Sequence, residues 1–153
     1  MRQPLRTGII GATGYVGQRF VTLLAGHPWF QVTALAASAR SAGKTYEEAV
    51  AGRWKIEQAM PEQVRTMTVL STDDLERWIE SVDFVFCAVD MKKDEIRALE
   101  DRIARLETPV VSNNSAHRWT DDVPMIIPEI NPDHAALIDL QRQIGRASCR
   151  ERV

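Results

Sequence analysis

The chain has 153 residues, of which 44% are hydrophobic and 26% charged, a composition typical of one globular domain rather than a fibre or a disordered segment. The formal net charge of −2 is spread along the chain, so no basic surface is expected to attract nucleic acid. No apolar run reaches the length of a membrane span or resembles a signal-peptide core, and two cysteines, Cys87 and Cys149, are too few for a disulfide framework. We therefore expect a cytoplasmic protein with neither nucleic acid nor a membrane as partner.

The first motif, over residues 5–20, joins a short apolar strand to a helix through a glycine-rich turn. Gly11 permits the tight turn out of the strand, Gly14 lets a pyrophosphate approach the backbone, and Gly17 lets the helix pack close to the sheet. A phosphate would then lie at the helix N-terminus, where unpaired N–H groups and the helix dipole favour an anion. The spacing predicts a nucleotide-binding turn, while a glycine-rich turn without a ligand remains the alternative.

Apolar β-type runs alternate with helical runs along the rest of the chain. The pattern predicts strands over residues 5–10, 31–36, 66–70, 83–88 and 109–112. It predicts helices from Tyr15 to about residue 26, near Asp73, from an N-cap at Asp90 to about residue 106, and after Asn131 and Pro132. This alternation indicates an α/β fold with a Rossmann-like, doubly wound, mainly parallel sheet and helices on both faces. The stretch over residues 51–61 shows no readable periodicity.

The loop after the second strand, residues 36–43, contains no acidic residue. A carboxylate at this place binds the ribose 2′-OH of NAD, whereas a 2′-phosphate needs cations and hydroxyls. Ser38, Arg40 and Ser41 supply these groups, so we favour NADP over NAD as cofactor. A solvated polar loop is the alternative. A P-loop ending at Thr45 is excluded, because that motif needs glycine at the position of Ser38.

Polar donors also follow the predicted fifth strand, at Asn113, Asn114, Ser115 and Arg118. Open α/β sheets bind ligands in the crevice beyond their strand ends, and amide, hydroxyl and guanidinium groups suit a phosphate or acyl oxygen. The competing interpretation is a surface ion pair between Arg118 and an acidic residue at 121 or 122.

Three stretches, GATGYVGQRF, LAASARSAG and SNNSAHRWTDDVPMIIPEIN, closely resemble aspartate-semialdehyde dehydrogenase of the archaeal and fungal type, over residues 5 to 140. The resemblance implies an NADP-dependent, homo-oligomeric enzyme of amino-acid biosynthesis that interconverts aspartyl phosphate and aspartate semialdehyde. In that family a cysteine thiolate forms a thioester with the substrate, and hydride passes to or from the nicotinamide.

The resemblance also implies roles for individual positions. The pyrophosphate would lie against Gly11, Thr13, Gly14, Tyr15, Val16 and Gly17. The adenosine 2′-phosphate would contact Ser38, Arg40 and Ser41. Ala88 and Val89 would line the nicotinamide side, with Asn114 near the cofactor, and Arg118 would hold the substrate phosphate.

The remaining cysteines and histidines do not suggest further chemistry. Cys87 lies within an apolar run, which favours a buried, inert thiol, and His117 and His134 lack the partner spacing of a metal site. The family's nucleophile is expected beyond Asn131 and does not appear, and Cys149 lacks the surrounding motif. We therefore assign no catalytic residue and no metal ligand, and expect this chain to be inactive alone.

The last ten residues, 144–153, back-translate to a nucleotide series that resembles a widely used sequencing adapter. We therefore expect an NADP-binding domain over residues 1–143 of an incomplete enzyme, followed by a non-native tail over 144–153. Two alternatives stay open: a related acyl-group reductase such as malonyl-CoA reductase, and a nucleotide-binding module that performs no chemistry.

Overall fold

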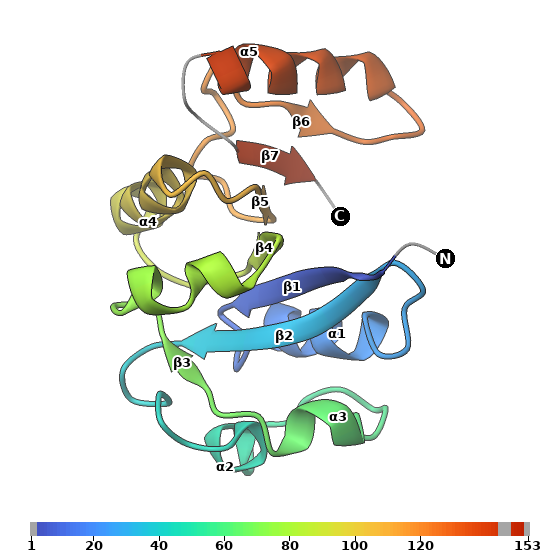
Figure 1. The fold of residues 1–153 in the computed structure, drawn as a ribbon, viewed down its shortest axis with the longest axis vertical. Helices are drawn as coiled ribbons and strands as arrows, with labels where there is room; N and C mark the ends of the chain where they lie inside the picture. Colours follow the sequence, from blue (N-terminus) through green and yellow to red (C-terminus); the bar gives the residue numbers. More distant parts are fainter. Residues whose placement is uncertain (1–2, 144–147, 152–153) are drawn as a thin grey trace.

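The computed structural model describes residues 3–143 and 148–151, and its strands form one sheet in the order β3-β2-β1-β4-β5-β7-β6 (Figure 1). All the neighbouring strands of this sheet pair in parallel. The strands are β1 (Leu5–Ile10), β2 (Phe30–Ala37), β3 (Leu70–Ser71), β4 (Phe84–Cys87), β5 (Val110–Ser112), β6 (Met125–Ile126) and β7 (Ser148–Glu151). Because β1 lies between β2 and β4, the strand order reverses at β1, as in a doubly wound Rossmann fold. The predicted fold class is confirmed.

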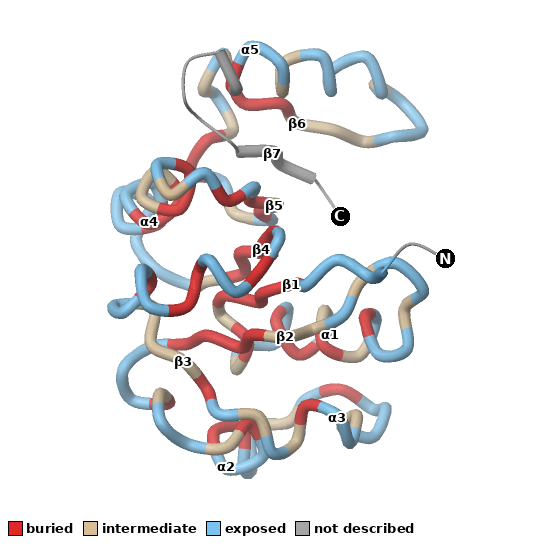
Figure 2. Tube along the Cα trace, viewed as in Figure 1, coloured by how far each residue is buried: buried red, intermediate tan, exposed pale blue. Residues whose placement is uncertain are grey.

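Helices lie against both faces of this sheet. They are α1 (Tyr15–Leu23), α2 (Tyr46–Val50), α3 (Glu62–Arg65), α4 (Lys93–Arg105) and α5 (Leu137–Gln143), with 3₁₀ turns at Leu75–Arg77, Ile79–Ser81 and Pro132–Ala136. Successive residues of a strand point to opposite faces, so the buried strand residues divide into two clusters. The central strands are buried, while the outward sides of the helices are exposed (Figure 2).

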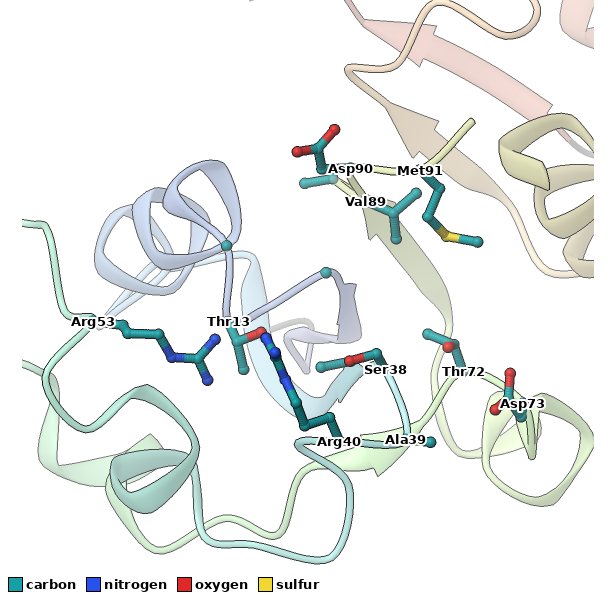
Figure 3. Close-up of a pocket in the computed structure, with 14 residues that line it drawn as sticks. Thr13, Ser38, Ala39, Arg40, Arg53, Thr72, Asp73, Val89, Asp90 and Met91 are labelled. Carbon is teal, nitrogen blue, oxygen red and sulfur yellow. The ribbon is translucent and has the colours of Figure 1, made fainter. Parts of the chain in front are cut away.

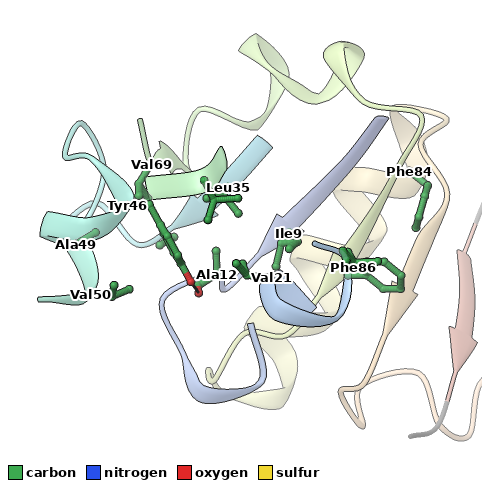
Figure 4. Close-up of a cluster of buried hydrophobic side chains, with 13 residues drawn as sticks. Ile9, Ala12, Val21, Leu35, Tyr46, Ala49, Val50, Val69, Phe84 and Phe86 are labelled. Atoms are coloured by element: carbon green, nitrogen blue, oxygen red, sulfur yellow. Dashed lines mark hydrogen bonds between the residues drawn. The ribbon is translucent and has the colours of Figure 1, made fainter. Parts of the chain in front are cut away.

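The first cluster joins the sheet to α1, α2 and α3 (Figure 4). Ile9 of β1 and Phe86 of β4 pack with Val21 of α1 and Tyr46 of α2, and Ile9, Val21 and Tyr46 are fully buried. The ring of Phe86 also stacks on Phe20, with the ring centroids 4.5 Å apart. Burying a large apolar side chain contributes about 1.5 to 3 kcal/mol, so this cluster fixes α1 beneath β1.

The second cluster covers the opposite face with the two central 3₁₀ turns and α4. Ile10 and Val85 of the sheet pack with Trp78, Leu99 and Ile103. In α4, Leu99 and Ile103 are four residues apart, the spacing that places two side chains on one helix face. This packing sets α4 beside β5, from where its polar residues reach the loop that follows β5.

Two of the strand and helix predictions are wrong in this part of the chain. The strand predicted over residues 66–70 is only a bridge from Thr68 to Thr45, and the parallel strand β3 begins at Leu70. The helix predicted near Asp73 is replaced by 3₁₀ turns, because the chain turns again at Trp78, which ends the first turn and begins the second.

Helix starts were predicted with mixed success. The helix predicted from an N-cap at Asp90 instead begins after Lys92, whose backbone N–H donates to the Glu95 carboxylate at 3.2 Å. The start after Asn131 is confirmed, with Pro132 at the first position of the 3₁₀ turn. The Asn131 amide does not cap this turn; it bridges Met125 and Ile127 of the preceding segment.

Part of the tail that the sequence assigns to non-native residues takes part in the sheet. The backbone of β7 pairs with β5 on one side and β6 on the other. Strand pairing uses backbone groups, so an open edge of β5 is a template for an extended segment of almost any sequence. Residues 144–147 and 152–153 of the predicted tail lie outside the described residues. In the described part of the chain no helix has the length and apolar character needed to cross a bilayer.

Candidate nucleotide-binding cleft

The turn between β1 and α1 has the close contacts that its glycines predict. Gly11 adopts a φ of +83°, and a Cβ there would lie 2.4 Å from the carbonyl oxygen of Ala88. At Gly17 a Cβ would lie 2.2 Å from the carbonyl oxygen of Gly11, so only glycine lets α1 pack this close to the turn. Gly14 is the N-cap of α1 and has no side-chain cap, which leaves N–H groups of the first helical turn for a ligand.

A cleft of about 660 Å³ opens beside this turn, at the carboxyl ends of β1, β2, β3 and β4 (Figure 3). Because the strands are parallel, these ends meet at one edge of the sheet, where the order reverses and where doubly wound folds bind ligands. Its lining residues are Gly11, Thr13, Gly14, Ala37, Ser38, Ala39, Arg40, Arg53, Thr72, Asp73, Ala88, Val89, Asp90 and Met91.

The positively and negatively charged side chains of this cleft lie on different sides of it. The guanidinium groups of Arg40 and Arg53 both point toward Thr13, at the turn between β1 and α1 (Figure 3). Asp73 and Asp90 lie on the other side, after β3 and β4. Among the described residues Arg40 has no ion pair or side-chain hydrogen bond, so its donors are free for an anion.

The structure brings many of the sequence-predicted residues to this cleft, namely Gly11, Thr13, Gly14, Ser38, Arg40, Ala88 and Val89. It places others elsewhere. Tyr15 and Val16 line a separate apolar hollow of about 280 Å³ with Asn113. Ser41 is only 3% exposed and does not line the cleft, because the chain turns back at this point and buries it. Gly17 lies under the turn, where it allows the packing of α1 and contacts no open space.

Asn114 does not line the cleft; it contacts a buried group of polar side chains around Glu100. Its Nδ2 donates to Glu100 at 3.4 Å and lies 3.6 Å from the sulfur of Cys87. Ser112 also donates to the Glu100 carboxylate, and His117 Nε2 lies 3.9 Å from it. The expected burial of Cys87 is confirmed, and burial, followed by the nearby Glu100 carboxylate, raises the pKa of its thiol, which favours an unreactive cysteine.

Arg118 lies in the loop after β5, outside the cleft lining. Its Nε is buried and has no hydrogen-bond partner, which is rare for a buried donor. A donor without a partner in this loop is compatible with the predicted contact to a substrate anion.

The histidines are held by other contacts. His117 is 7% exposed, with Nε2 3.3 Å from Asp101 and Nδ1 3.2 Å from Thr120. His134 Nδ1 lies 3.1 Å from the backbone N–H of Met125. Within residues 3–143 and 148–151, no group of three or more His, Cys, Asp or Glu side chains is arranged to hold a metal ion.

Seven lining residues were not predicted from the sequence, namely Ala37, Ala39, Arg53, Thr72, Asp73, Asp90 and Met91. Asp90 and Met91 follow a predicted strand directly, so the strand-end rule could have found them. Thr72 and Asp73 were missed because β3 lies later in the chain than predicted. No pattern pointed to Arg53, which lies in the stretch without periodicity.

The profile of the family described as "Semialdehyde dehydrogenase, NAD binding domain" matches residues 6–138. The match covers the cleft, the glycine turn and the loop after β5. This chain belongs to that family.

Curated members of the semialdehyde dehydrogenase family include two informative relatives. Aspartate-semialdehyde dehydrogenase of Methanothermobacter thermautotrophicus is 44% identical over 91% of this chain and 38% of its own length. Malonyl CoA reductase (NADP) of Metallosphaera sedula is 40% identical over 94% of this chain and 38% of its own length. The chain therefore spans about two fifths of the length of these relatives.

A solved structure agrees with the curated relatives. The crystal structure of aspartate semialdehyde dehydrogenase with NADP from Candida albicans superposes with a TM-score of 0.85 at 33% identity. The match covers 97% of this chain and 42% of that chain.

Proposed function

We propose that this chain is the NADP-binding part of an aspartate-semialdehyde dehydrogenase, which interconverts L-aspartate 4-semialdehyde and 4-aspartyl phosphate. The observation that carries the proposal is the cleft at the strand-order reversal, which is lined by both the glycine turn and the unpaired Arg40. The names of the relatives support the choice of enzyme.

The residues of the cleft fit a dinucleotide. A Cβ on Gly14 would meet only the carbonyl oxygen of Gly11, at 3.4 Å, so the backbone at Gly14 is not crowded by its surroundings and a pyrophosphate can approach it. Ser38 and Arg40 stand at the end of β2, where a 2′-phosphate would lie. When bound, NADP supplies the hydride acceptor. The chain's own residues bind and orient it, with Ala88 and Val89 beside the nicotinamide.

The preference of the chain for NADP or NAD tests the proposal. Arg40 favours the 2′-phosphate of NADP, whereas Asp73 also lines the cleft and a carboxylate favours the free ribose of NAD. We expect NADPH to bind more tightly than NADH. A charge-assisted contact to a phosphate is worth about 1.5 to 3 kcal/mol, so Arg40→Ala should remove roughly tenfold or more of that preference. Calorimetric titration of both variants with both nucleotides measures it. Equal affinity of the unsubstituted chain for NADPH and NADH would refute the assignment.

A malonyl-CoA reductase is the second candidate, because the relative of that name is nearly as similar as the dehydrogenase from Methanothermobacter thermautotrophicus. The two substrates differ at the leaving group, phosphate or CoA thiolate, so the substrate pocket decides between them. We propose Arg118 as the phosphate contact. In an enzyme completed by its natural C-terminal half, Arg118→Ala should raise KM for phosphate far more than KM for NADPH.

We also propose that residues 1–143 form the NADP-binding unit and that 144–153 are a non-native tail. The complete enzyme would be a homo-oligomer of the cytoplasm with no nucleic acid or membrane partner. Size-exclusion chromatography with light scattering of the completed enzyme would measure its oligomeric state.

A further inference from the structure

Arg53 is a second cationic residue of the cleft, and nothing in the sequence pattern singles it out. It follows α2, in a part of the chain distant in sequence from both the glycine turn and Arg40. Its side chain enters the cleft from the opposite direction to that of Arg40, and the two guanidinium groups converge on Thr13 (Figure 3). Two like charges brought together without a counter-ion are unfavourable unless an anion joins them.

A buried glutamine holds the backbone of Arg53 against the glycine turn. Gln18 of α1 is only 1% exposed. Its Nε2 donates to the carbonyl oxygens of Thr13 at 3.0 Å and Arg53 at 2.9 Å, while its Oε1 accepts from the N–H of Lys55 at 2.8 Å. One carboxamide therefore fixes residues 53–55 relative to the turn that would bind the pyrophosphate.

The side chain of Arg53 is itself tethered. One terminal nitrogen donates to the carbonyl oxygen of Ala49 in α2. A guanidinium carries five N–H donors, so the others remain for a ligand. Among the described residues neither Arg40 nor Arg53 forms an ion pair with a carboxylate. The tether reduces the rotamer freedom that Arg53 would lose on binding an anion.

We propose that Arg53 and Arg40 together bind the adenosine 2′-phosphate of NADP, with Gln18 as the positioning residue for Arg53. The inference rests on the proposed function and names a second specificity-determining residue for it. A phosphomonoester carries nearly two negative charges at neutral pH and offers several acceptor oxygens, so it suits two guanidinium groups. The pyrophosphate has its own donors at the N-terminus of α1.

The test titrates the 153-residue chain with adenosine 2′,5′-bisphosphate and with adenosine 5′-monophosphate, which differ only in the 2′-phosphate. Arg53→Ala should weaken binding of the bisphosphate about tenfold and leave binding of the monophosphate unchanged. Arg77→Ala is the matched control, because this substitution removes the same charge from an exposed residue that does not line the cleft. Equal weakening of both nucleotides, or no weakening beyond the control, would overturn the proposal.

The role of Gln18 is tested by coupling. Gln18→Leu should weaken bisphosphate binding, and Arg53→Ala on that background should add little, whereas Arg40→Ala should keep its full effect. Thermal midpoints measured in parallel separate loss of folding from loss of positioning. Independent, additive effects of Gln18→Leu and Arg53→Ala would remove the positioning role. Because Arg53 is exposed, the Arg53→Ala series decides the main proposal even where Gln18→Leu does not fold.

The failure of this inference differs from failure of the proposed function. A chain that binds NADPH and the bisphosphate, with Arg53→Ala indistinguishable from Arg77→Ala, overturns only the assignment of Arg53. A folded chain that binds neither NADPH nor the bisphosphate overturns the proposed function and this inference with it.

Discussion

Gly14 and Gly17 have different physical tasks, although both belong to one glycine-rich turn. A Cβ at Gly17 would meet backbone of Gly11 at 2.2 Å, and backbone cannot move aside without shifting α1. A Cβ at Gly14 meets its nearest atom at 3.4 Å, and the φ of −77° suits any residue. Glycine is therefore required at position 17 for folding and at position 14 for ligand binding.

We expect Gly17→Ala to lower the free energy of unfolding by about 1 to 3 kcal/mol, as for overpacking. Gly14→Ala should leave stability nearly unchanged and weaken NADPH binding on the order of tenfold, because its methyl group would enter the space for the pyrophosphate. Urea unfolding and calorimetric titration of both variants measure the two effects. The same loss of stability in both would contradict this division of roles.

Tyr46 supports the turn from below through its hydroxyl, which donates to the carbonyl oxygen of Ala12 at 2.8 Å. Desolvation by burial raises the pKa of Tyr46 above its ordinary value of 10.0. A raised pKa means that the folded state disfavours the tyrosinate form. The contribution of the protonated Tyr46 to stability is therefore complete below about pH 10 and is lost as the pH rises above that value.

We expect Tyr46→Phe to lower the free energy of unfolding at pH 7 by about 1 to 3 kcal/mol, because the Ala12 carbonyl loses its buried partner. The unsubstituted chain should lose stability above about pH 10 more steeply than Tyr46→Phe. Urea unfolding curves between pH 7 and the alkaline range measure the difference between the two proteins. Parallel pH profiles would show that folding does not raise the pKa of Tyr46.

At the scale of elements, α4 holds the loop after β5 through several polar contacts. Arg97 donates to the carbonyl oxygen of Ala116 at 2.8 Å, and Glu100 accepts from Ser112 and Asn114. Arg97 and Glu100 are three residues apart and therefore lie on one face of α4. The helix thus positions the loop that carries both Asn114 and Arg118.

We expect Glu100→Ala to lower the free energy of unfolding by about 2 to 3 kcal/mol, because it leaves buried donors without their acceptor. Glu100→Gln should keep more of the stability, since its amide oxygen still accepts a hydrogen bond. Asp94→Ala is the control, an exposed carboxylate on the same helix. Chemical unfolding measures all three. Equal losses of stability in Glu100→Ala and Glu100→Gln would show that a hydrogen-bond acceptor at position 100 is not what stabilises this loop.

The sequence allowed the central elements to be predicted where one strong local signal was present. Strand β1 and the start of α1 follow from an apolar run and the glycine spacing, and β5 agrees with the strand predicted over residues 109–112. The short helix α2 was missed, although Thr45 and Glu48 form a capping box that marks its start.

Other features depend on contacts between distant segments, which no local pattern carries. Arg53 reaches the cleft because Gln18, 35 residues earlier, binds its carbonyl group. Ser41 looked like a ligand residue beside Arg40, but the turn after β2 buries it. The candidate site could therefore be located from the sequence, whereas its complete lining could not.

At the scale of the whole molecule, several large apolar side chains lie at the surface. Tyr15 is 65% exposed, Leu23 55%, Trp119 83% and Ile130 75%. Tyr15 and Leu23 border the same apolar hollow on α1. A stand-alone binding module would be expected to present a polar surface, whereas apolar hollows such as the one that Tyr15 and Leu23 border are typical of surfaces that contact other protein. They favour the proposal of a larger enzyme, as does the length of the relatives.

The last prediction separates nucleotide binding from catalysis in the 153-residue chain. Thioester chemistry needs a thiolate at the substrate carbon, and binding groups such as Arg118 cannot replace that covalent step. Cys87 is fully buried with a raised pKa, and the side chain of Cys149 lies outside the described residues. We therefore expect no NADPH formation from aspartate semialdehyde, phosphate and NADP, and no change on Cys149→Ser.

NADPH absorbance measures turnover, with the enzyme completed by its natural C-terminal half as the active control. Turnover by the chain alone that disappears in Cys149→Ser would make Cys149 the nucleophile and overturn both the non-native tail and the expectation of inactivity.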